Sequence, residues 1–148
     1  MSTYSQLYIH VVFSVKNRDP LLSKSWRDRL YQYIVPIIEK RKNKVYAISG
    51  TDDHIHIFFS MSPSQSISSL MLEVKRDTSI WIKKNMFVKC RFEWQEGYGA
   101  FSYSKTHIDN VVKYIHNQDN FHKNKSSLGE YKEILEKYEA DFKDEYVT

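Results

Sequence analysis

The sequence predicts an α/β (α+β) fold: a ferredoxin-like sandwich with a central antiparallel sheet, helices on one face and an added C-terminal helix that bears a tyrosine. Apolar residues alternate with a period of two in short segments and recur at helical spacing in longer ones. Turn residues separate the segments, and their order is strand, helix, strand, strand, helix, strand. That order is typical of a ferredoxin-like fold, in which the first and third strands are central neighbours.

The first half of the chain supplies three of the strands. Residues Gln6–Val15 alternate apolar and polar side chains and predict an inner strand. A helix is expected over about Ser25–Lys42, and Pro36 inside it should kink or interrupt it. Val45–Ser49 and His54–Met61 predict the second and third strands, with a turn between them.

The second half predicts a helix, a hairpin and two further helices. These elements are expected at Ser66–Lys84, at Phe92–Gln95 paired with Ala100–Ser104, at His107–His122, and at Leu128–Phe142. We expect Thr106 to cap the helix that begins at His107.

Length and composition indicate one domain. With 148 residues, 41% of them hydrophobic, the chain can bury a single core. Residues 126–148 carry seven acids and three bases, which leaves residues 1–125 with 19 bases, 11 acids and a net charge of +8. We expect residues 1–125 to form a basic body and residues 126–148 an acidic amphipathic helix of the same domain. A basic body is compatible with a nucleic-acid partner, as are many unrelated domains.

Targeting signals are not apparent in the sequence. It contains no apolar run near the length of a membrane span and no secretory signal, so no membrane association is expected. A single cysteine, Cys90, excludes an internal disulfide and favours a reducing, cytoplasmic setting.

Two pairs of polar residues stand out as candidate chemistry. His54 and His56 flank one apolar residue on a predicted strand, so both imidazoles should lie on one face of the sheet. Tyr114 and Gln118 are four apart and should lie one turn apart on one side of a helix. Together they offer two nitrogen ligands, one oxygen ligand and a phenol nucleophile, which suits metal-assisted cleavage of a phosphodiester.

Each pair also has a purely structural interpretation. Two histidines so spaced are often ordinary polar residues of a strand, and a helical tyrosine usually serves packing. On a helical wheel, however, Tyr114, Gln118 and His107 lie together on one flank of the apolar stripe rather than within it. His10 should lie close to the two histidines on the neighbouring strand, where a structural hydrogen bond is the main alternative to a role in the site.

Three segments in this order resemble the small single-tyrosine HUH transposases of simple insertion sequences and the related REP-associated tyrosine transposases. The segments are Asp53–Ile57, Trp94–Ser102 and Tyr114–Gln118, and the resemblance runs from about Tyr4 to about Lys123. The family often has a double histidine shortly after the glutamine, whereas this chain has Phe121 and His122. The difference concerns any role of Phe121 in the site, whereas the residues of the three matched segments are unaffected.

The resemblance implies a DNA transposase whose catalytic domain is residues 1–125. It implies cleavage and rejoining of single-stranded DNA at hairpin-marked element ends through a 5′-phosphotyrosine, with Tyr114 as nucleophile and Mg²⁺ or Mn²⁺ held by His54, His56 and Gln118. It also implies a homodimer, with active sites that the two subunits can share. Asp52 and Asp53 are candidates to orient a histidine ring. The residues expected to contact DNA are His10, Tyr98, Tyr103, Lys105 and His107.

Two other classes of function were weighed against this one. A domesticated relative could bind single-stranded nucleic-acid hairpins without cleaving them, because ferredoxin-like sheets also bind RNA. A histidine phosphoesterase with two H-x-[ST] motifs is disfavoured, because the sequence contains no such motif. A replication or conjugation nickase would share the chemistry but usually needs a longer chain.

Overall fold

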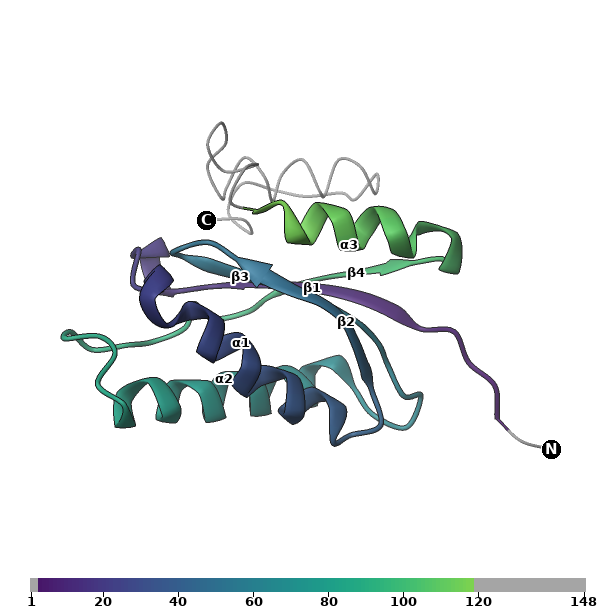
Figure 1. Cartoon of the computed structure of the whole chain (residues 1–148). Helices are drawn as coiled ribbons and strands as arrows, with labels where there is room; N and C mark the ends of the chain where they lie inside the picture. The colour runs from purple at the N-terminus through teal and green to yellow at the C-terminus, as the bar shows by residue number, and fades with distance from the viewer. Residues whose placement is uncertain (1–2, 119–148) are drawn as a thin grey trace.

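The computed structural model describes residues 3–118 and has three layers (Figure 1). The middle layer is one four-stranded sheet. Helices α1 and α2 cover one face of it, and α3 lies across the other. The elements are β1 (Tyr8–Ser14), η1 (Lys16–Arg18), α1 (Lys24–Glu39), β2 (Lys44–Gly50), β3 (His54–Ser60), α2 (Ile67–Lys84), β4 (Gly99–Tyr103), η2 (Lys105–His107) and α3 (Ile108–His116).

The sheet has the strand order β2-β3-β1-β4, and every neighbouring pair is antiparallel. This confirms the predicted ferredoxin-like order, with β1 and β3 at the centre. Their register runs from Tyr8 opposite Ser60 to Ser14 opposite His54. Side chains on these two strands therefore alternate between the two covered faces, and almost all of them are buried.

The main core lies between the sheet and the two helices α1 and α2. Alternate apolar residues of β1 and β3 meet the apolar stripes of both helices there. Each fully buried large side chain of this kind contributes about 1.5–3 kcal/mol relative to an exposed one. The fully buried members of this main core include Val11, Ile55, Ile57, Phe59, Leu22, Leu30, Ile34, Leu70, Val74, Ile82 and Phe92.

Helices α1 and α2 start at serine caps and are tied together near the end of α1. The hydroxyl of Ser66 accepts a hydrogen bond from the Ser69 amide at 3.1 Å, which satisfies a helix-terminal donor. Glu73 of α2 pairs with Lys40 at 2.6 Å and with Arg41. Hydrogen bonding to Lys40 is the largest influence on Glu73 and holds the pKa of its carboxyl below the ordinary value. Pro36 does not interrupt α1, which continues to Glu39.

The predicted hairpin before β4 is wrong. Residues 92–95 do not pair with residues 100–104; instead, Trp94 forms an isolated bridge with Val15, just beyond the end of β1. Strand β4 pairs with the same edge of β1. Both segments therefore follow one strand, and residues 96–98 form an excursion between them. The local pattern resembled a hairpin, but the edge of β1 supplies the hydrogen-bond partners.

A lysine of α2 binds the backbone of the excursion of residues 96–98. The ammonium of Lys75 donates hydrogen bonds to the carbonyl oxygens of Gln95, at 2.8 Å, and of Gly97. Burial lowers the pKa of Lys75 from its ordinary value. Gly97 has φ of 86°, a conformation that glycine adopts without the strain of a side chain.

The second face of the sheet is covered by α3. Val111 and Ile115 are buried in one cluster with Ala47 and Phe58. Thr106 is not the cap of this helix: His107 occupies the N-cap position, and no side chain caps the helix there. The continuation of the predicted helix to His122, and the predicted helix of residues 128–142, lie outside the described residues. Among the helices of residues 3–118, none has the length and apolarity to cross a membrane.

Gly50 allows the turn before His54 to close tightly. A Cβ atom at this position would overlap the carbonyl oxygen of His54 and lie 2.9 Å from the Cα of Ile55. We predict that Gly50→Ala lowers the free energy of unfolding by about 1–3 kcal/mol, because the backbone of the turn must shift. Urea denaturation measures the change. The exposed helical substitution Asn110→Ala is the control and should stay within about 0.5 kcal/mol. Equal values for the two variants would contradict the overlap.

Candidate active site

His54 and His56 lie side by side on the face of β3 that α3 covers. Alternation along the strand puts both rings on this face, and their centroids are 5.0 Å apart at an interplanar angle of 70°. The exposed fractions are 3% for His54 and 0% for His56. Buried imidazoles need hydrogen-bond partners, and each ring meets a different one.

The ring of His54 is held by residues of the turn that precedes it. Its Nδ1 lies 2.6 Å from Oδ1 of Asp53 and 2.9 Å from Oγ1 of Thr51. Thr51 also donates to Oδ1 of Asp53 at 3.1 Å, so three side chains form one network. With Nδ1 engaged in this way, Nε2 is the nitrogen of His54 suited to a metal ion. Asp52, the other candidate to orient a ring, is exposed in the same turn.

The ring of His56 is held from the neighbouring strand. Its Nδ1 lies 2.8 Å from Nε2 of His10. The two rings stack with centroids 5.0 Å apart and an interplanar angle of 29°, and both residues are fully buried. Nε2 is therefore also the nitrogen of His56 suited to a metal ion.

Tyr114 of α3 lies over the histidines. Its ring is 5.8 Å from that of His56 at 90° and 6.3 Å from that of His10 at 74°. It also packs against the small apolar cluster of Val12 and Phe101, and it remains partly exposed. The structure therefore brings residue 114 of the helix to residue 56 of the strand, as a site assembled from both would require.

Gln118 follows one turn after Tyr114 and is fully buried. Its Nε2 donates to the carbonyl oxygen of Tyr114 at 3.1 Å, and an amide coordinates a metal ion through its oxygen, here Oε1. The ring of His107, just before α3, lies 6.4 Å from that of Tyr103 near the Ser60 end of the sheet, and Tyr114 lies against His56. Helix α3 therefore advances toward the end of β3 that carries His54, and one further turn of about 5.4 Å carries Gln118 in that direction.

The residues expected to contact DNA are spread over several places. Tyr98 is exposed on the excursion of residues 96–98, and Lys105 and His107 are exposed on η2. Tyr103 is half-buried, with its ring 6.2 Å from that of His10, and burial raises its pKa to about 12. His10 is fully buried beneath these rings and is not brought to the surface.

Thr51 was not singled out from the sequence, although it holds His54. It was part of a turn in which polar residues are expected in any case. Its spacing could have indicated the contact, because the hydroxyl of a threonine three residues before a histidine can reach the imidazole across a tight turn. Ser104 was also missed: its hydroxyl lies 2.7 Å from Nδ1 of His107.

The donor set fits a divalent metal ion. Two imidazoles have their Nδ1 atoms engaged by protein groups, and Gln118 supplies a buried amide one turn after Tyr114. Among residues 3–118, no three His, Cys, Asp or Glu side chains cluster in a way that could hold a metal ion. Gln118 is the candidate for a third protein ligand.

Comparison with known proteins defines the class to which this chain belongs. The family model of IS200-like transposases matches residues 3–118, and the chain belongs to that family of transposases. This confirms the resemblance drawn from the sequence motifs, and a transposase-type function follows from it. No curated protein is similar enough in sequence to count as a match.

Two solved structures share the fold. One is a protein assigned as a transposase from Deinococcus radiodurans, with a TM-score of 0.65 and 18% identity over 80% of this chain and 95% of that one. The other is a REP-associated tyrosine transposase bound to a REP hairpin, with a TM-score of 0.58 and 18% identity over 82% of this chain and 74% of that one. At this level of identity, the likeness concerns the fold.

Proposed function

We propose that this transposase cleaves and rejoins single-stranded DNA through Tyr114. The observation that carries the proposal is the edge-on contact of Tyr114 with His56, at 5.8 Å between ring centroids, on the face that also carries His54. In the proposed step, the phenol oxygen of Tyr114 forms a bond to phosphorus and the bond from phosphorus to the 3′ oxygen breaks. The products are a 5′-phosphotyrosine and a strand with a free 3′-hydroxyl, which takes up a proton.

The side chains around Tyr114 position the reacting groups. Val12 and Phe101 pack against the tyrosine ring and restrict its direction. His54, His56 and Gln118 are the proposed ligands of Mg²⁺ or Mn²⁺, and Mn²⁺ tolerates imidazole better. When bound, such an ion supplies charge neutralisation at the non-bridging oxygens of the scissile phosphate. Because the phosphotyrosine stores the energy of the broken bond, another 3′-hydroxyl can reverse the step and rejoin strands without ATP.

The proposed substrate is DNA that folds into a hairpin. Its support is the basic character of residues 1–125 and the fold shared with a transposase described as bound to a REP hairpin. Tyr98, Tyr103, Lys105 and His107 remain the proposed DNA contacts, because aromatic and basic side chains bind unpaired bases and phosphates.

Tyr114→Phe tests the nucleophile. The variant loses only a hydroxyl, so folding and DNA binding should persist while the covalent adduct falls to background. The measurement is a gel assay with labelled hairpin DNA and Mn²⁺. The matched control is Tyr4→Phe, at a tyrosine that is 82% exposed on the N-terminal segment, and it should leave the adduct unchanged. An undiminished adduct in the Tyr114 variant would exclude this nucleophile.

The metal ligands are tested separately. His54→Ala and His56→Ala should each abolish cleavage, whereas Gln118→Ala should weaken Mn²⁺ binding with a smaller loss, because an amide is the weakest of the three ligands. Calorimetric titration of Mn²⁺ and cleavage assays measure the two effects. The control is His116→Ala, at an exposed position of the same helix as Tyr114. Full cleavage in excess chelator would show that no metal is required.

Substrate form is tested by competition. A folded single-stranded hairpin should compete for binding much better than a fully paired duplex of the same sequence, and binding of both should weaken as salt rises. Filter binding at several salt concentrations measures both. Equal competition, or equal cleavage of the duplex, would favour a double-strand nuclease over this proposal.

We also propose a homodimer, whose two subunits can share each active site or each build its own. If they share the sites, a chain with His54→Ala and His56→Ala should restore cleavage when mixed with a Tyr114→Phe chain, because one of the two sites of the mixed dimer is then intact. The measurement is adduct formation after mixing and re-equilibration, with each variant alone as the control. A mixture that stays inactive would indicate sites built within one chain.

A further inference from the structure

We propose that His10 is a positioning residue, which fixes the ring of His56 by accepting a hydrogen bond from Nδ1. The inference rests on the proposed function, since it assigns a role toward the proposed metal ligand. Its basis is the 2.8 Å distance between Nε2 of His10 and Nδ1 of His56, at a place where both residues are fully buried. In the β1–β3 register, His10 is a diagonal neighbour of His56, because Val12 lies directly opposite it.

The chemistry of the contact determines which ring donates. A neutral imidazole that binds a metal ion through Nε2 carries its proton on Nδ1. His56 is then the donor and Nε2 of His10 the acceptor, so the proton of His10 lies on Nδ1. The two proposed histidine ligands thus have different partners: a carboxylate, Asp53, for His54, and an imidazole for His56.

The surroundings of His10 favour a role in positioning the ring of His56 over direct contact with DNA or service as a metal ligand. The rings of Phe101, Tyr103 and Tyr114 enclose it at centroid distances of 6.0, 6.2 and 6.3 Å. A direct contact with DNA would require exposure, and His10 has none. Service as a third ligand through Nε2 would require the ring to give up its contact with His56.

Two substitutions separate these roles. In His10→Gln, the amide oxygen reaches about as far along the side chain as the imidazole Nε2 and can accept the same hydrogen bond. His10→Phe keeps a ring of similar volume but has no acceptor. Calorimetric titration of Mn²⁺ without DNA should show about 10–100-fold weaker binding for His10→Phe and near wild-type binding for His10→Gln. Unchanged binding in both variants would overturn the proposal, and equal loss in both would indicate a direct ligand instead.

A measurement on the unsubstituted chain keeps the proposal testable if His10→Phe fails to fold. Nitrogen-15 spectra of the histidine rings should show Nδ1 of His56 protonated and coupled across the hydrogen bond to Nε2 of His10. A proton on Nε2 of His56 in the Mn²⁺-free protein would overturn the assignment. Failure of the proposed function would look different from failure of the His10 proposal. In the first case, the wild-type protein would bind no Mn²⁺, or the Tyr114→Phe variant would still form the covalent adduct.

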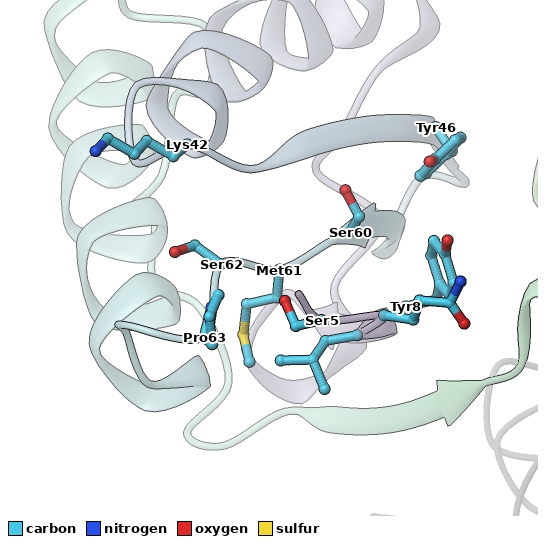
Figure 2. Close-up of a pocket in the computed structure, with 10 residues that line it drawn as sticks. Ser5, Tyr8, Lys42, Tyr46, Ser60, Met61, Ser62 and Pro63 are labelled. Atoms are coloured by element: carbon cyan, nitrogen blue, oxygen red, sulfur yellow. The ribbon is translucent and has the colours of Figure 1, made fainter. Parts of the chain in front are cut away.

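An independent observation concerns a cavity of about 300 Å³ at the far end of the same sheet face (Figure 2). Tyr8 and Ser60 lie opposite each other there and continue the alternation that carries His10 and His56. Lys42 and Ser62 lie toward one end of the cavity and the two tyrosines Tyr8 and Tyr46 toward the other. Among the described residues, those that line it include no aspartate or glutamate.

The geometry points to a subsite for one nucleotide of the single-stranded substrate, and it too rests on the proposed function. A base suits the end with aromatic rings, and a phosphate suits the other end, where Lys42 and Ser62 point outward from the tyrosines. The ammonium of Lys44 lies 5.0 Å from the centroid of the Tyr46 ring and adds positive charge at the aromatic end. Ser60 is four residues from His56 along β3, about 13 Å at the rise of a strand, so the cavity lies close to the proposed site, although α3 covers the face between them.

The salt dependence of binding tests the subsite. With the Tyr114→Phe chain, so that no cleavage intervenes, Lys42→Ala should weaken binding of single-stranded DNA several-fold and reduce the salt slope by about 0.7, as loss of one phosphate contact requires. The matched control is Lys89→Ala, an exposed lysine away from the cavity, which should leave the slope unchanged. Equal effects of the two substitutions would show only general electrostatic attraction and overturn the subsite.

Photocrosslinking identifies the aromatic end directly. DNA carrying 5-iododeoxyuridine should crosslink to the peptides that contain Tyr8 or Tyr46, and crosslinks confined to other peptides would overturn the subsite. The binding and crosslinking experiments do not require cleavage. A failed adduct assay would therefore count against the proposed function, whereas the crosslinking result tests the subsite separately.

Discussion

The antiparallel pairing of β1 with β3 is the constraint on which the rest of the structure depends. Its register sets Val12 opposite His56 and Ser14 opposite His54, and so brings His10 beside His56. The same register directs Val11 and its neighbours to the opposite face, where they meet α1 and α2. A shift of one residue would exchange the faces and bury the histidines in the main apolar core.

The two faces of the sheet serve different purposes. The face toward α1 and α2 is apolar and supplies the core. The face toward α3 carries buried polar rings, whose burial costs free energy unless hydrogen bonds compensate. Asp53 and Thr51 engage His54, and His10 engages His56, so the cost of burying each imidazole is offset by contacts within the sheet and its turn. Such a network gives each ring a defined direction, which a metal or phosphate site requires.

The sequence patterns predicted most elements because their signals are local. Helix α2 begins within a residue of the expected start and ends at the expected Lys84, since its apolar stripe and its serine cap agree. The prediction of the hairpin failed because a strand distant in the sequence determines the pairing. Residues 92–95 have the alternation and the following glycines of a hairpin, yet they pair beyond the end of β1. Pro36 lies inside α1, which continues to Glu39, although a proline ring removes the hydrogen bond to the carbonyl four residues earlier.

By itself, the sequence determined the order of the elements, the common face of His54 and His56, and the one-turn spacing of Tyr114 and Gln118. These features depend on the periods of a strand and a helix, which are properties of the backbone. Only the tertiary structure decided that α3 lies on the face opposite α1 and α2, that Tyr114 rests on His56, and that His10 and Thr51 hold the two rings. Such contacts join residues far apart in the chain or across a tight turn, and they follow from how the sheet and helices pack rather than from any local pattern.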